Sequence, residues 1–189
     1  MAALFYDLAS PYAYLAVERA ARVLGTEPVL EPVALGAIFR VRGFGSWAHT
    51  ERREQEMAEV ERRAAANGLP PVTWPPGWPA NSLHAHRAVV WAERHGRGPD
   101  LAHAAYRAAF QRGADLVDHA VLRALVSDLG LSPDEMEAAI AEPALKDAFK
   151  RRTEAAIALG VRGVPTLQVG DALLFGDDQL ERAAQAPMR

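Results

Sequence analysis

A strand–helix–strand pattern at the N-terminal end of the chain constrains the fold more than any other feature. Residues 2–8 are strand-like and stop abruptly at Ser10, after which residues 11–24 repeat apolar side chains at helical spacing. Gly25 is placed to end this helix, and residues 28–33 form a second short apolar run. Two strands joined by a helix pair in parallel, so this unit predicts an α/β fold.

The C-terminal end of the chain returns to the same kind of pattern. Residues 143–159 read as a long amphipathic helix, and two strand-like runs follow at 166–169 and 172–175. The short turn between these runs predicts a hairpin, and a last helix is expected to begin near Asp177.

Helical patterns fill the region between these two units. The charged stretch 46–68 is followed by residues 69–81, whose five prolines exclude a helix interior or a central strand. Further helices are expected over three segments and from a capping box at Ser132 to Glu135; the three segments are 81–95, 100–112 and 118–129. We therefore predict a thioredoxin-like βαβ…ββα sheet with an all-helical insertion. The sheet domain would comprise residues 1–40 and 143–189, and the insertion domain residues 41–142.

Composition narrows the classes of function. Half of the 189 residues are hydrophobic, enough for a sizeable core, and the formal net charge is −3. Such a charge gives no field that would steer the protein onto nucleic acid or a membrane. The absence of cysteine excludes disulfides and dithiol redox chemistry by the chain itself. No signal peptide or membrane-spanning run is visible, which favours a cytoplasmic protein.

Ser10 is the first candidate site residue. Serine followed by proline is typical of a helix start, where the hydroxyl accepts a backbone N–H and proline occupies the first helical position. That structural reading is the more common one for any Ser-Pro pair. A hydroxyl at a helix N-terminus can also help to stabilise an anion.

The second and third candidates lie in the C-terminal unit. Val164-Pro165 precedes a predicted central strand, at the place where thioredoxin-like folds keep a cis-proline. The likeness to such folds implies a cis peptide bond here and an outward-facing Val164 backbone able to pair with an extended ligand. The alternative is that Pro165 is a simple strand-entry residue. The run Phe175-Gly176-Asp177-Asp178 could hold a ligand's ammonium group, or its two aspartates could only cap the last helix.

The histidines and tryptophans carry less weight. His84 and His86 are two residues apart and face different sides of a predicted helix, and no HExxH pattern occurs, so no metal site is expected. Trp74 and Trp78 could wall a pocket, although tryptophans flanked by proline more often anchor packing. Tyr12 is expected to pack in the core.

Four segments of the chain resemble the 2-hydroxychromene-2-carboxylate isomerase family, whose members are related to kappa-class glutathione transferases and to DsbA. The segments are FYDLASPYAYLA, EPVALGAIFR, the proline-rich stretch ending in ANS, and GVRGVPTLQVGDALLFGDDQLE. They occur in the expected order and span nearly the whole chain. The resemblance implies a thioredoxin-like fold and a glutathione-dependent cis–trans isomerase of aromatic catabolism.

The resemblance also implies roles for individual residues. Ser10 would steady the sulfur of glutathione or another low-molecular-weight thiol, and Val164 with Pro165 would hold the thiol's backbone. Phe175, Gly176, Asp177 and Asp178 would form the end of the site that receives the γ-glutamyl group.

Two further positions would serve the substrate, a small aromatic carboxylate. Arg40 stands where the family usually has lysine and would bind the substrate's carboxylate, and Asn81 would lie near the substrate unless it is only a helix cap. The chain departs from the family at Phe44, where a polar residue is usual, and at Asp177, where glutamine is common.

Two alternatives to the isomerase remain at this point. A kappa-like glutathione transferase would release the thiol adduct as its product, and a non-catalytic protein would only bind a thiol or a peptide. The resemblance also implies a homodimer.

Overall fold

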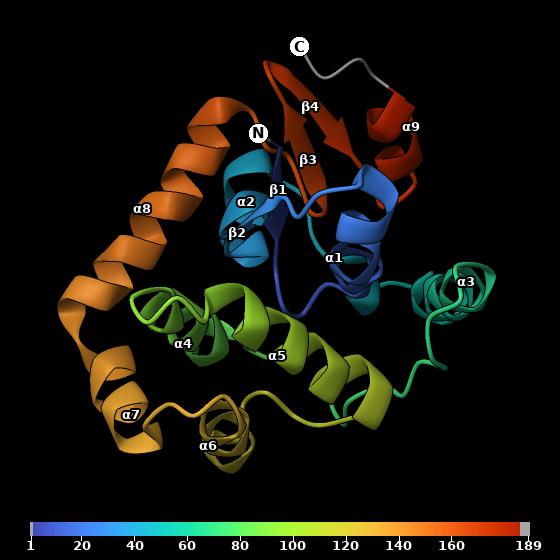
Figure 1. The fold of residues 1–189 in the computed structure, drawn as a ribbon. Coiled ribbons are helices and arrows are strands. Elements are labelled where there is room, and N and C mark those ends of the chain that lie inside the picture. Colours follow the sequence, from blue (N-terminus) through green and yellow to red (C-terminus); the bar gives the residue numbers. More distant parts are fainter. Residues whose placement is uncertain (1, 186–189) are drawn as a thin grey trace.

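A four-stranded sheet joins the two ends of the chain, seen here in a computed structural model that describes residues 2–185. The strands are β1 (Ala3–Tyr6), β2 (Val29–Pro32), β3 (Thr166–Val169) and β4 (Ala172–Phe175), and they lie in the order β2-β1-β3-β4. β1 pairs in parallel with β2, while β3 runs antiparallel to both β1 and β4. The predicted parallel unit and the predicted hairpin are therefore confirmed, and the two ends of the chain lie side by side in one sheet (Figure 1).

Helices surround this sheet and continue away from it. They are α1 (Pro11–Leu24), α2 (Leu35–Arg42), the 3-10 turn η1 (Trp47–His49), α3 (Arg53–Ala66), α4 (Leu83–Glu93), α5 (Gly98–Arg112), α6 (His119–Asp128), α7 (Pro133–Ala141), α8 (Pro143–Leu159) and α9 (Gln179–Gln185). α4 contacts α5, α7 and α8, and α8 leads from this helical group back to the sheet (Figure 1). The division into a sheet domain and an insertion domain at residues 41 and 142 stays a prediction.

One helix near the sheet has no counterpart in the sequence pattern. α2 spans only eight residues, Ile38 is its one buried residue, and its first residue follows Ala34, which offers no side-chain cap. The sequence of a two-turn helix with so little amphipathic periodicity cannot be told from that of a loop. α2 matters because it forms one wall of the cavity described below.

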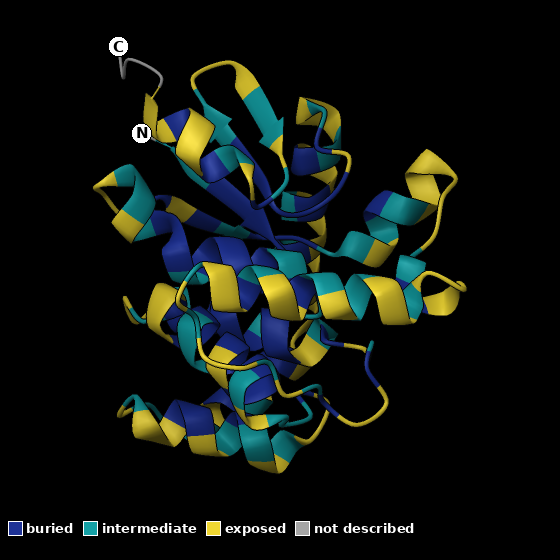
Figure 2. Cartoon of the chain, turned by 90° about the vertical axis from the view of Figure 1, so that its right-hand side faces the viewer, coloured by how far each residue is buried: buried dark blue, intermediate teal, exposed yellow. Residues whose placement is uncertain are grey.

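The core is continuous from the sheet into the helical group. Buried positions gather where the helices meet the sheet and each other, and exposed positions follow the outer faces of the helices (Figure 2). Tyr6, Tyr14 and Tyr106 are fully buried at this junction, and the Tyr106 hydroxyl donates to the backbone oxygen of Asp7 at 2.8 Å. The helical group is thus attached directly to the loop that follows β1. None of the helices in residues 2–185 is long and apolar enough to cross a membrane.

A half-buried group of charged residues holds α5 against α1, with Glu18 on α1 and two basic residues on α5. His103 Nδ1 lies 2.6 Å from Glu18 Oε1, and Arg107 Nε donates to Glu18 Oε2 at 2.8 Å. The hydrogen bond to Glu18 raises the pKa of His103 in spite of burial. Burial alone would raise the pKa of Glu18, but the hydrogen bonds from His103 and Arg107 lower it below its ordinary value.

We expect this pair to make stability depend on pH. The contribution of His103 is complete below its ordinary pKa of 6.5 and is lost as pH rises through the raised value. That of Glu18 is complete above 4.5 and is lost as pH falls through the lowered value. His103→Gln should therefore lower the free energy of unfolding by about 1.5 kcal/mol near pH 5.5 and by clearly less near pH 8.5.

Urea unfolding at these two pH values checks the expectation. The exposed His95 lies at a tilt against the Trp91 ring and has no acidic partner among the described residues, so His95→Gln is the matched control. A His103→Gln deficit that is the same at both pH values, or no larger than that of His95→Gln, would show that the ion pair contributes nothing.

Candidate active site

A cavity of about 1230 Å³ lies between the sheet and the proline-rich segment. Four parts of the chain line it: the turn from β1 into α1, the stretch from Ala34 through α2 and η1 to Arg52, residues 78–83, and the loop before β3 together with Phe175 at the end of β4. Because these parts are far apart in the sequence, the cavity exists only once the sheet has joined both ends of the chain.

Ser10 lies at this cavity as the N-cap of α1. It is 6% exposed, its Oγ accepts the N–H of Ala13 at 3.2 Å, and its own N–H donates to the backbone oxygen of Asp7 at 2.9 Å. The structural reading of this serine is therefore correct. No hydrogen bond among residues 2–185 uses the Ser10 hydroxyl as a donor, so the O–H remains available to a group in the cavity.

Val164 lines the same cavity, and the peptide bond between Val164 and Pro165 is cis, as the sequence predicts. Within the described chain, neither the N–H nor the C=O of Val164 has a hydrogen-bond partner. The loop itself is anchored, since Thr166 Oγ1 donates to the Gly163 oxygen at 2.7 Å and the Gly176 N–H donates to the Pro165 oxygen at 3.0 Å. Val164 thus offers a fixed donor and acceptor to an extended ligand.

The four residues from Phe175 to Asp178 are in different surroundings. Phe175 is 63% exposed and lines the cavity, whereas Asp178 is exposed in the turn that follows and is not one of the lining residues. Gly176 has a φ of 118°, a conformation that strongly favours glycine. Because of this turn, Phe175 lies at the cavity and Asp177 lies against α1 and α3.

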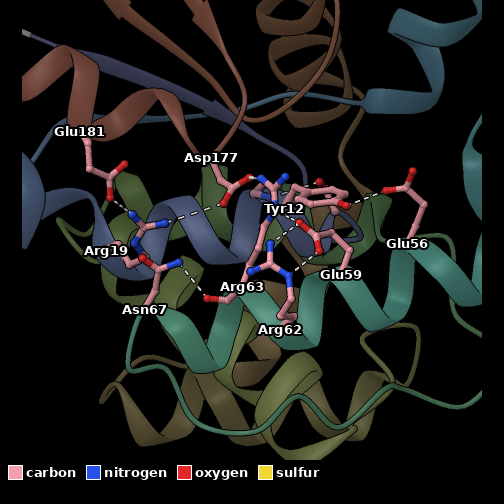
Figure 3. Close-up of polar contacts among 11 residues, drawn as sticks. Tyr12, Arg19, Glu56, Glu59, Arg62, Arg63, Asn67, Asp177 and Glu181 are labelled. Carbon is pink, nitrogen blue, oxygen red and sulfur yellow. Dashed lines mark hydrogen bonds and ion pairs between the residues drawn. The ribbon is translucent and has the colours of Figure 1, made fainter.

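Asp177 does not face the cavity, contrary to the role that the family resemblance implies. Its residue is 3% exposed, Oδ1 accepts from Arg63 Nη1 at 2.7 Å, and Oδ2 lies 3.8 Å from Arg19 Nη1. Burial raises the pKa of Asp177, and the two arginines oppose that shift. Figure 3 shows this carboxylate directed at the guanidinium groups of α1 and α3. Both oxygens are occupied, so Asp177 is not in a position to receive a ligand's ammonium group.

The two predicted substrate residues both line the cavity. Arg40 is exposed on α2, and no carboxylate among residues 2–185 pairs with it. The N-cap of α4 is Ser82, but Asn81 Oδ1 accepts the N–H of Leu83, the first residue of α4, at 3.1 Å, so Asn81 holds the start of this helix and is also a wall residue.

Aromatic side chains form much of the remaining wall, and one of them, Tyr12, also packs against the core, as the sequence predicts. Besides Phe175, they are Tyr12, Phe39, Phe44, Trp47 and Trp78. Trp78 is also a packing anchor, because its Nε1 donates to the Ala9 oxygen at 2.8 Å. Tyr12 donates its hydroxyl to Glu56 Oε2 at 2.6 Å, and burial together with this bond raises the pKa of Tyr12. The phenol therefore stays protonated, and Tyr12 is not a candidate acid or base in the cavity.

Asp7 and His86 hold the Ser10 turn, and neither was singled out for this from the sequence. The Asp7 carboxylate accepts the N–H groups of Ala9 at 2.8 Å and of Leu35 at 2.7 Å, so it joins the turn to the start of α2. His86 is fully buried; its Nε2 accepts the Leu8 N–H at 3.0 Å, and its Nδ1 lies 2.8 Å from the Ser82 oxygen. A backbone N–H only donates and a carbonyl only accepts, so the two contacts assign Nε2 of His86 as the acceptor and Nδ1 as the donor.

These two residues left only a weak signal in the sequence. A polar residue directly after a strand, as Asp7 is, could have suggested a turn-forming carboxylate. Nothing in the helical pattern separates His86 from an ordinary core histidine. Among residues 2–185, no three His, Asp or Glu side chains group as a metal site requires.

Comparisons with known proteins agree with this geometry. A family profile described as the DsbA-like thioredoxin domain matches residues 3–186. The chain is 28% identical to a protein named 2-hydroxychromene-2-carboxylate isomerase from Sphingobium xenophagum, over 94% of this chain and 92% of that one.

Solved structures show the same fold. A 2-hydroxychromene-2-carboxylate isomerase structure superposes with a TM-score of 0.87 at 20% identity, covering 96% of this chain and 91% of that chain. The cytosolic disulfide reductase DsbM from Pseudomonas aeruginosa, solved with GSH, has a TM-score of 0.66 at 21% identity, covering 96% and 92%. The predicted α/β thioredoxin-like fold and the predicted similarity to these isomerases are confirmed, and the chain belongs to the DsbA-like thioredoxin domain family.

Proposed function

We propose that this protein is a glutathione-dependent cis–trans isomerase of 2-hydroxychromene-2-carboxylate or a similar aromatic carboxylate. The observation that carries the proposal is the Ser10 hydroxyl. It caps α1, donates to no group among residues 2–185 and faces the cavity that Val164 also lines, whose backbone N–H and C=O have no partner in that part of the chain. A helix N-terminus with an added hydroxyl donor stabilises a thiolate.

The residues present fit a thiol peptide of this kind. Val164 can pair with the peptide's backbone through its N–H and C=O, and the exposed Asp178 can receive the γ-glutamyl ammonium group. Asp177, which the resemblance also implied, is left out because Arg19 and Arg63 occupy its carboxylate.

Bound glutathione would supply a sulfur nucleophile that adds reversibly to a conjugated double bond, so that the bond becomes single, rotates and reforms with the opposite geometry. The protein's own residues hold and orient the thiol and the substrate. Ser10 donates a hydrogen bond at the place where the sulfur is held, and Arg40 provides a bidentate partner for the substrate's carboxylate. The aromatic wall accepts a planar ring and excludes water from it.

The absence of cysteine also favours an isomerase over a disulfide oxidoreductase. The similar proteins named as disulfide reductases or oxidoreductases have the same fold, but this chain contains no cysteine. Its own side chains therefore cannot exchange dithiol and disulfide. The cytoplasmic location and the homodimer that the resemblance implies remain predictions.

An absorbance assay of 2-hydroxychromene-2-carboxylate conversion tests the proposal. Turnover should require glutathione, saturate with its concentration and return the thiol unchanged, whereas S-methylglutathione should inhibit because it lacks the sulfur nucleophile. Accumulation of a stable glutathione adduct would instead indicate a kappa-like transferase. Glutathione binding without any conversion would indicate a non-catalytic thiol-binding protein, and conversion that is independent of glutathione would contradict the proposal.

A further inference from the structure

Arg162 is the one exposed residue in an otherwise buried loop. Val161 and residues 163–167 are all buried, and the loop is held at its start by the Val161 N–H, which donates to the Ala156 oxygen at 3.0 Å. Arg162 lines the cavity and stands two residues before Val164. Its backbone is therefore fixed, and only the side chain has to be ordered when a ligand binds.

Arg162 has no ion-pair partner among residues 2–185. No carboxylate among the described residues pairs with Arg162 or Arg40, whereas the third wall arginine, Arg52, is paired with Glu56. Asp7 is the only acidic residue in the described lining, and its two oxygens accept the Ala9 and Leu35 N–H groups. The cavity therefore has positive charge for two separate anionic groups, one at α2 and one at the loop before β3.

The position of Arg162 relative to Asp178 gives the thiol site a direction. On the carboxyl side of Val164, the Gly176 N–H donates to the Pro165 oxygen, which brings the turn containing Asp178 next to Pro165. Arg162 lies on the amino side. An extended peptide that pairs antiparallel with Val164 directs its C-terminal residue toward Arg162 and its N-terminal residue toward Asp178. A peptide in the parallel direction would place the glycyl carboxylate beside Asp178 and would leave Arg162 beside the γ-glutamyl end, whose ammonium and carboxylate groups carry no net charge.

We propose, on the basis of the proposed function, that Arg162 binds the glycyl carboxylate of glutathione and that the tripeptide runs antiparallel to residues 162–164. A guanidinium matches a carboxylate with two parallel hydrogen bonds, so the contact would fix both affinity and orientation. Arg40 then remains free for the carboxylate of the substrate.

Calorimetric titration with two forms of the thiol tests this inference. The probes are glutathione and its monoethyl ester, in which the glycyl carboxylate is blocked and the remaining groups are unchanged. Wild-type protein should bind glutathione at least tenfold more tightly than the ester. Arg162→Gln should lose that preference by weakening glutathione binding at least tenfold, while its affinity for the ester stays within twofold of wild type.

Arg151→Gln is the matched control, because Arg151 is exposed on α8 outside the cavity and its replacement changes the net charge equally. This variant should retain the full preference for glutathione over the ester. If wild type binds glutathione and the ester with equal affinity, or if Arg162→Gln keeps the wild-type preference for glutathione, the inference is wrong and the proposed function stands. If wild type does not bind glutathione at all, the proposed function and the inference fail together.

Discussion

Arg63→Ala is expected to lower the free energy of unfolding by about 2 kcal/mol, within the range for losing a hydrogen bond to a charged group, because Asp177 is buried while the Arg63 side chain is 31% exposed. The Asp177 side chain is 4% exposed and lies 2.7 Å from Arg63, so the variant leaves a buried carboxylate that only Arg19, 3.8 Å away, still faces. Arg63 also lies over the Tyr12 ring, 5.4 Å from its centroid. The effect reaches the cavity wall, because Tyr12 is part of it.

Arg62→Ala provides the control, since Arg62 and Arg63 both pair with Glu59 but the Arg62 side chain is 66% exposed and contacts neither Asp177 nor Tyr12. Its stability in urea unfolding should be nearly that of wild type. Without Arg63, burial raises the pKa of Asp177 further, so the deficit of Arg63→Ala should shrink at acid pH, where the carboxyl group becomes neutral. Equal effects of the two substitutions would show that the Arg63–Asp177 contact contributes little.

Ser10→Ala is expected to reduce kcat of the glutathione-dependent isomerisation roughly 10- to 100-fold at neutral pH, the equivalent of one hydrogen bond to a charged group. The same change removes the N-cap of α1 and should cost about 1 kcal/mol of stability. The chain offers a matched control in Ser132, whose Oγ caps α7 by accepting the Glu135 N–H at 3.3 Å.

Ser132→Ala should therefore produce a similar loss of stability and no loss of turnover. Thermal unfolding and steady-state kinetics on the three proteins separate the two roles of Ser10. A Ser10→Ala protein that is less stable but turns over like wild type would reduce Ser10 to a helix cap.

Local signals explain why so much of the fold could be predicted. The helix at 143–159 and the strands at 166–169 and 172–175 have the predicted bounds, because each combines a clear period with a turn or cap at its end. Ser10 and Ser132 were predictable as caps for the same reason. α2 was not predictable, since eight residues with one buried side chain carry almost no periodicity.

The candidate site was only partly predictable because its decisive contacts join distant residues. Ser10, Val164 and Arg40 do line one cavity, but the resemblance could not show that Asp177 turns inward to Arg63, 114 residues away in sequence. The pairing of His86 with the Leu8 backbone spans 78 residues and leaves no local pattern. Contacts of this kind depend on the completed packing of α3 and α4, which no short motif records.

The ultraviolet absorbance of the glutathione thiolate, measured as the pH is lowered in the presence of wild-type protein, tests the central claim most directly. If the N-terminus of α1 and the Ser10 hydroxyl stabilise the sulfur as an anion, the bound thiolate should persist at least one pH unit below the point where free glutathione protonates. Bound glutathione that titrates together with free glutathione in the same buffer would contradict the account.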